Sequence, residues 1–155
     1  MAEERIDRGS RTLRAPVAAV YRALTERDAL EAWLPPDGMT GRITRFEPWP
    51  GGGFDLVLTY LDPDAGQGKT SESTDAAEVG FVELVPGERV VQRIEFDSPD
   101  PDFAGTMTMT WRLTEGSEGT LVTVEATDVP RGISQADHEE AFASSLANLA
   151  AHVEG

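Results

Sequence analysis

The chain has 155 residues, of which 28 are acidic and 13 basic, so its formal net charge is −15. A charge of this sign and size repels phosphate backbones, and we expect no nucleic acid among its partners. The absence of cysteine excludes disulfides, thiolate nucleophiles and cysteine-based metal sites.

The first part of the chain predicts one strand followed by two short helices. Arg5–Arg14 is typical of an edge strand, and Ala15-Pro16 then opens a helix because proline suits the first helical position. Thr25-Glu-Arg-Asp28 has the spacing of an N-cap followed by an acidic residue at the third helical position, so a second helix is predicted to begin there. Pro35-Pro36-Asp37-Gly38 ends this helix.

From Thr40 onward apolar residues tend to alternate with polar ones, and a period of two predicts strands. The predicted strands are Thr40–Glu47, Phe54–Leu61, Ala76–Val85, Glu88–Phe96, Met107–Leu113 and Thr120–Thr127. A glycine-rich turn at Pro48–Gly53 separates the first two, and Pro86-Gly87 makes a hairpin of the next pair. Asp62–Asp75 and Asp97–Ala104 carry no pattern and are predicted to be loops.

The last segment of the chain predicts a long helix. Ser134-Gln-Ala-Asp137 has the pattern of a helix cap. Phe142, Leu146, Leu149 and Val153 then recur on one side at helical spacing. We expect this apolar stripe to cover one face of the sheet.

These elements predict an α+β fold in a single domain, residues 1–155. Successive strands joined by short turns form an antiparallel sheet of about six to seven strands, with the helices gathered on one face. The apolar runs are much shorter than the roughly 20 residues that a membrane span needs, and the charged N-terminus lacks the apolar core of a secretory signal. We therefore expect a cytoplasmic protein without a membrane span.

Five segments, in this order, carry a resemblance to a known family: Ala15-Pro16-Val17 with Val20-Tyr21, Leu24–Trp33, Gly52-Gly53-Phe54, Gly80–Pro86 with Glu88-Arg89-Val90, and Ser144–Leu149. Over nearly its whole length the chain resembles the activator of heat-shock protein 90 ATPase homologue family, within the START-like (SRPBCC) superfamily. The resemblance implies a helix-grip fold, in which the sheet curls around the last helix and encloses a cavity. It does not imply one activity, because the superfamily includes lipid carriers, hormone receptors and polyketide cyclases.

The chain departs from the family's pattern early in the last helix. Where a Gly-Trp pair usually stands, this sequence has Ala141-Phe142. A smaller ring at this position enlarges the cavity unless Trp111 or a methionine fills the space.

The main candidate site is an apolar cavity between the sheet and the last helix. Ligand sites are typically apolar with a few placed polar groups, and methionine adapts to varied shapes. The residues predicted to line the cavity are Leu56, Leu58, Tyr60, Met107, Met109, Trp111, Phe142, Leu146 and Leu149. The alternative is that these side chains simply fill the core, and the sequence leaves both open because strand register is not fixed by it.

Two polar residues are added to the predicted ligand site. Gln92 stands between apolar neighbours on its strand face, where an unpaired amide would cost ~1–3 kcal/mol, so it needs a partner in the protein or in the ligand. His138 precedes Phe142 by one helical turn and could orient a substrate or act as a base, although a solvated helix start explains Asp137-His-Glu-Glu140 better. His138 and His152 would lie ~21 Å apart on one helix, so they cannot share a metal.

Three functions follow from these observations. The first is a carrier or sensor that binds a small apolar or aromatic molecule. The second is a cyclase- or hydrolase-like enzyme that uses the same cavity, with Tyr60, Gln92 or His138 as its polar groups. The third, which the sequence supports least, is a co-chaperone-type interaction module with a chaperone as its partner. No catalytic residue, metal or cofactor is assigned.

Overall fold

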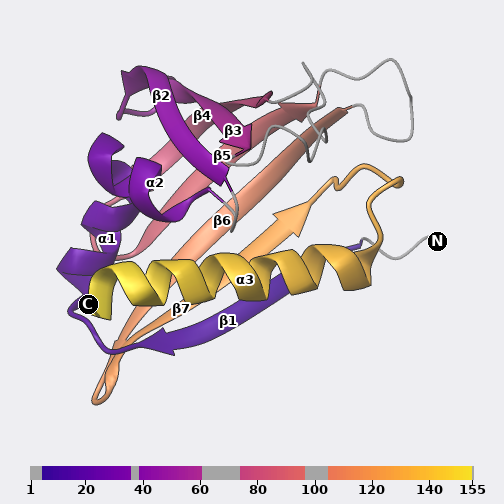
Figure 1. Cartoon of the computed structure of the whole chain (residues 1–155). Helices are drawn as coiled ribbons and strands as arrows, with labels where there is room; N and C mark the ends of the chain where they lie inside the picture. The colour runs from indigo at the N-terminus through magenta and orange to yellow at the C-terminus, as the bar shows by residue number, and fades with distance from the viewer. Residues whose placement is uncertain (1–4, 36–38, 61–73, 97–104, 155) are drawn as a thin grey trace.

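The computed structural model describes residues 5–35, 39–60, 74–96 and 105–154 (Figure 1). Ten elements follow one another, in the predicted order. They are β1 (Asp7–Leu13), α1 (Val17–Thr25), α2 (Arg27–Trp33), β2 (Met39–Glu47), β3 (Gly53–Tyr60), β4 (Thr74–Val85), β5 (Arg89–Phe96), β6 (Gly105–Gly116), β7 (Gly119–Thr127) and α3 (Gln135–Glu154).

The seven strands form one antiparallel sheet in the order β1-β7-β6-β5-β4-β3-β2. All neighbours except β1 and β7 are consecutive in the chain, so the sheet is a meander closed at one edge by the first strand. Figure 1 shows α3 running along β1 and ending beside α1 and α2. This arrangement confirms the α+β, helix-grip expectation, with β1 as an edge strand.

Helix α3 covers the free edge of β1 as well as the sheet face. The carboxylates of Glu139 and Glu154 accept hydrogen bonds from the backbone N–H groups of Arg8 and Arg14, each at 2.9 Å. These bonds occupy donors that an exposed edge would otherwise offer to another strand. Gly9 allows the close approach, because a Cβ at that position would lie 2.8 Å from the Cβ of Phe142.

The core lies between the inner face of the sheet and the three helices. On β6 the residues Met107, Met109, Trp111 and Leu113 are buried, as the period of two predicts. On α3 the buried residues are Phe142, Leu146, Leu149 and Ala150. Helix α2 joins this core through Trp33, whose ring meets that of Trp111 edge to face at a centroid distance of 5.7 Å. None of the three helices is long and apolar enough to cross a bilayer.

Of the three predicted helix starts, one N-cap is confirmed and two lie one residue from the predicted position. The Ser134 Oγ accepts a hydrogen bond from the Asp137 N–H at 3.1 Å, as predicted. The prediction that Thr25 caps α2 is wrong: Thr25 ends α1, its hydroxyl donates to the Tyr21 carbonyl, and Glu26 takes the N-cap position. Pro16 is likewise the N-cap of α1 and not its first helical residue.

The predicted loops fall largely outside the described residues. This holds for residues 62–73 of the first loop and for Asp97–Ala104, and also for Leu61 of the preceding predicted strand and Pro36–Gly38 of the predicted helix end. Thr74 and Asp75, at the end of the first predicted loop, already belong to β4.

Candidate functional site

A cleft of about 650 Å³ opens between α2, β2 and the C-terminal turns of α3. Its volume is in the range of small-molecule binding sites. It is lined by Glu31, Ala32, Trp33, Pro35, Met39, Thr40, Gly41, Asn148, Ala151 and His152. The cleft thus lies beside the far end of the C-terminal helix and at the β2 edge of the sheet, and none of the residues predicted to line the cavity is among its lining residues.

One wall of the cleft is held rigidly by contacts between α2 and β2. The Glu31 carboxylate accepts a hydrogen bond from the Ile43 N–H at 2.7 Å, and the Arg27 guanidinium donates to the Ile43 carbonyl at 2.6 Å. The indole N–H of Trp33 donates to the Ala23 carbonyl at 2.7 Å, which fixes the ring beneath the cleft. These bonds hold α2 against β2 on one side and against α1 on the other.

Gly41 lines the cleft and lies next to Pro35, Leu56 and Leu58. A Cβ there would lie 2.6 Å from Cγ of Pro35, 3.1 Å from Cδ1 of Leu56 and 3.6 Å from Cδ2 of Leu58. The absence of a side chain lets Pro35 pack on β2. Two of the residues predicted to line the cavity, Leu56 and Leu58, therefore lie directly behind the cleft.

Most of the other predicted lining residues pack in the core. Leu58 is partly buried, and the side chain of Tyr60 is outside the described part of the structure. The buried ones are Leu56, Met107, Met109, Trp111, Phe142, Leu146 and Leu149, each at most 9% exposed. Ligand contact by these residues stays a prediction.

Gln92 has the protein partner that its position requires. Its side-chain oxygen accepts a hydrogen bond from the indole N–H of Trp111 at 3.0 Å, and the residue is buried. The bond satisfies the Gln92 side-chain oxygen and the Trp111 indole N–H inside an apolar core.

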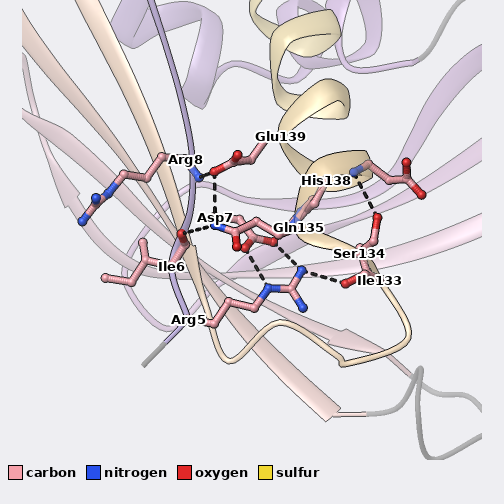
Figure 2. Close-up of polar contacts among 10 residues, drawn as sticks. Arg5, Ile6, Asp7, Arg8, Ile133, Ser134, Gln135, His138 and Glu139 are labelled. Carbon is pink, nitrogen blue, oxygen red and sulfur yellow. Dashed lines mark hydrogen bonds and ion pairs between the residues drawn. The ribbon is translucent and has the colours of Figure 1, made fainter. Parts of the chain in front are cut away.

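His138 pairs with a buried carboxylate on β1 (Figure 2). Its Nδ1 lies 2.6 Å from Oδ2 of Asp7, and because a carboxylate only accepts, Nδ1 carries the proton. Arg5 donates to both oxygens of Asp7, at 2.8 and 2.9 Å, and also to the Ile133 carbonyl. The helix start is solvated at Asp137 and Glu140, as expected, but His138 itself is mostly buried and packs on Phe142.

The sequence reasoning missed Asp7. Burial raises the pKa of its carboxyl group, but the hydrogen bonds from Arg5 and His138 outweigh this and leave the pKa below its ordinary value. The alternation of the strand is a weak signal for it: counting back in twos from the buried Leu13 places Arg11, Gly9 and Asp7 on one face, but Arg11 is exposed.

Replacing Asp7 by asparagine should lower the free energy of unfolding at pH 7 by about 1–3 kcal/mol, because the change removes a fully buried charge partner of Arg5. The pKa of Asp7 is lower in the folded protein than in the unfolded chain, where it is about 3.9. The ionised carboxylate therefore stabilises the fold above about pH 3.9, and this stabilisation is lost as the pH falls through the folded-state pKa. The difference from the unchanged protein should therefore shrink as the pH falls below about 4.

Urea unfolding across this pH range measures the effect. Asp137→Asn is the matched control, since Asp137 is exposed on the same helix end, and it should change stability by less than about 0.5 kcal/mol. A constant difference between Asp7→Asn and the unchanged protein down to pH 2 would show that the Asp7 charge is not what stabilises the fold.

The polar residues do not converge on one point. Across the sheet, Gln92 pairs with Met109, Met109 with Ala126, and Ala126 with Asp7, so Gln92 lies three strand spacings, roughly 14 Å, from the partner of His138. His138 is also 10 to 14 residues, roughly 15–21 Å, along α3 from the helix residues that line the cleft. No group of three potential metal ligands occurs among the described residues.

Comparison with known proteins places this geometry in a family. The family model described as Activator of Hsp90 ATPase homolog 1-like protein matches residues 14–154. The crystal structure of protein CV1439 from Chromobacterium violaceum is 29% identical, with a TM-score of 0.83 and 97% of each chain covered. The solution NMR structure of the AHSA1-like protein from Aeromonas hydrophila is 15% identical, with a TM-score of 0.75, and the match covers 97% of this chain and 92% of that one. No curated protein matches the chain.

Proposed function

The chain belongs to the Activator of Hsp90 ATPase homolog 1-like protein family, and from this premise we propose that it binds a small apolar or aromatic molecule in the cleft between α2, β2 and α3, as a carrier or sensor. One observation carries the proposal: the cleft of about 650 Å³ beside the C-terminal helix. A helix-grip fold holds its ligands between the sheet and this helix.

The lining of the cleft suits such a ligand. Trp33, Pro35 and Met39 supply an aromatic ring, a flat aliphatic ring and a flexible thioether. Methionine in particular adapts to ligands of varied shape. Leu56 and Leu58 lie near Gly41 but are not among the residues that line the cleft.

A ligand of greater length would reach the remaining predicted residues only if α2 or α3 moved away from the sheet. Met107, Met109, Trp111, Phe142, Leu146 and Leu149 then become contacts of the buried end of the ligand, with Gln92 as the polar group nearest to Trp111. This deeper binding mode is the extended form of the proposal.

Filling the cleft should abolish binding without affecting the fold. Ala151 is exposed and lines the cleft, so Ala151→Phe places a ring in the space of the ligand. Ala147 is exposed on the same helix, one turn earlier, and is not among the lining residues, so Ala147→Phe is the matched control. We expect Ala151→Phe to weaken binding of the neutral fluorescent probe N-phenyl-1-naphthylamine about tenfold or more, a change of about 1.4 kcal/mol or more.

Fluorescence titration of the probe, with circular dichroism to check folding, makes this measurement. Equal affinities of the two variants would place the probe elsewhere. Failure of the unchanged protein to bind the probe or any compound of a broad hydrophobic library would remove the proposed function.

The two alternative functions have less support. An enzyme needs polar groups that converge on one substrate atom, and Gln92 and His138 each face a different partner in the described structure. Only the family's name supports a co-chaperone role. Neither the enzyme nor the co-chaperone role is supported by an arrangement of described residues comparable to the cleft.

A further inference from the structure

The charged groups around the cleft are unevenly distributed. Glu31 is the one formally charged residue among the described lining residues, and no lysine or arginine lines the cleft with it. The whole chain carries a net charge of −15, so the surrounding potential has the same sign. Among the lining residues that the structure describes, a ligand therefore meets one negative side chain and no lysine or arginine.

The Glu31 carboxylate keeps one oxygen available. The hydrogen bond from the Ile43 N–H and the ion-pair contact with Arg27 both involve Oε2, the latter at a long 3.9 Å. No described residue donates a hydrogen bond to Oε1. Arg27 is half exposed and donates its short hydrogen bond to the Ile43 carbonyl, so it offsets the Glu31 charge only in part.

Helix α3 adds a second source of negative potential and two free polar side chains. Its C-terminal turns face the cleft, and the last carbonyls of a helix carry a partial negative charge. Asn148 and His152 stand one helical turn apart in the lining. Neither side chain hydrogen-bonds another described residue, so both can donate to or accept from a polar group of a ligand.

We propose that the cleft selects amphipathic ligands whose polar group is neutral or cationic, such as an alcohol, amide or amine, and discriminates against carboxylates. The inference rests on the proposed function and names the ligand class for that site. An amine or hydroxyl can donate to the free oxygen of Glu31, with Asn148 and His152 completing its hydrogen bonds. A carboxylate has no proton to donate and brings a second negative charge next to the first in a partly desolvated space.

A matched ligand series tests this selectivity. 2-(2-Naphthyl)ethylamine, 2-(2-naphthyl)ethanol and 2-naphthylacetic acid share one apolar body and differ in the polar group. Each is titrated at pH 8 against protein loaded with N-phenyl-1-naphthylamine. We expect the amine and the alcohol to displace the probe with Kd values about tenfold or more below that of the acid.

Two charge-neutralising variants then locate the cause. Glu31→Gln keeps an oxygen for the Ile43 N–H and should reduce the amine-to-acid difference to about threefold or less. Asp28→Asn changes the net charge equally at an exposed position of α2 outside the lining, and should leave the difference as it is.

Each outcome is decisive. Equal affinities for the amine and the acid in the unchanged protein would overturn the selectivity while leaving the cleft as a binding site. Equal effects of Glu31→Gln and Asp28→Asn would assign the selectivity to net charge and overturn the role of Glu31. Absence of any probe binding would instead overturn the proposed function, and the selectivity with it.

Discussion

Deleting residues 134–155 should leave a chain without a cooperative thermal transition. The deletion removes α3, and with it the buried side chains of Phe142, Leu146 and Leu149 that cover the inner face of the sheet. It also removes the acceptors of the Arg8 N–H on β1 and of the Arg14 N–H just after it, and the imidazole that bonds the buried Asp7. We expect an aggregating or molten species, because the inner face of the sheet is then exposed to water.

Calorimetry and size-exclusion chromatography measure this outcome, with the full chain as the reference. A truncated protein that remained monomeric and melted cooperatively near the temperature of the full chain would show that α3 does not hold the sheet together. The helix-grip interpretation of the fold's stability would then be wrong.

Leu146→Ala should lower the free energy of unfolding by about 2–5 kcal/mol. Leu146 is 1% exposed and reaches β1, since its Cδ1 would lie 3.5 Å from a Cβ placed on Gly9. The change removes buried apolar contacts and leaves a void that the rigid strand cannot fill. Leu146 lies outside the lining of the cleft, so affinity for N-phenyl-1-naphthylamine in the folded variant should stay within about twofold.

Urea unfolding measures the stability, and Ser144→Ala is the control because Ser144 is exposed on the same helix. The control should change stability by less than about 0.5 kcal/mol. A loss below about 1 kcal/mol for Leu146→Ala would indicate that the side chain borders an existing cavity and already lacks contacts. That result would favour the sheet–helix interior over the outer cleft as the ligand site.

The fold could be predicted from the sequence because the residue patterns that indicate its helices and strands are local. The alternation from Met107 to Leu113 has the period of a strand, and Ser134 sits three residues before an acidic residue at the start of an apolar stripe. The cap at Thr25 failed for a physical reason: a threonine hydroxyl at a helix end can equally bond back to the carbonyl four residues earlier, as it does here with Tyr21.

The candidate site was less predictable, because it depends on packing between distant segments. The cleft joins residues near Trp33 and Gly41 with residues near Asn148, and nothing in the sequence fixes how far α3 extends over β2. Gln92 was correctly expected to need a partner, which proved to be Trp111. Asp7 was not predicted because aspartate is rarely fully buried and the charged segment around it is typical of a solvated edge strand.

The most direct test of ligand binding in the cleft is a two-dimensional amide NMR titration with N-phenyl-1-naphthylamine. Binding there predicts shifts concentrated at Gly41, Ala151, the indole N–H of Trp33 and the side-chain amide of Asn148, with little change at Asp7. Shifts confined to the Asp7 end of α3, or no saturable shift at all, would contradict it.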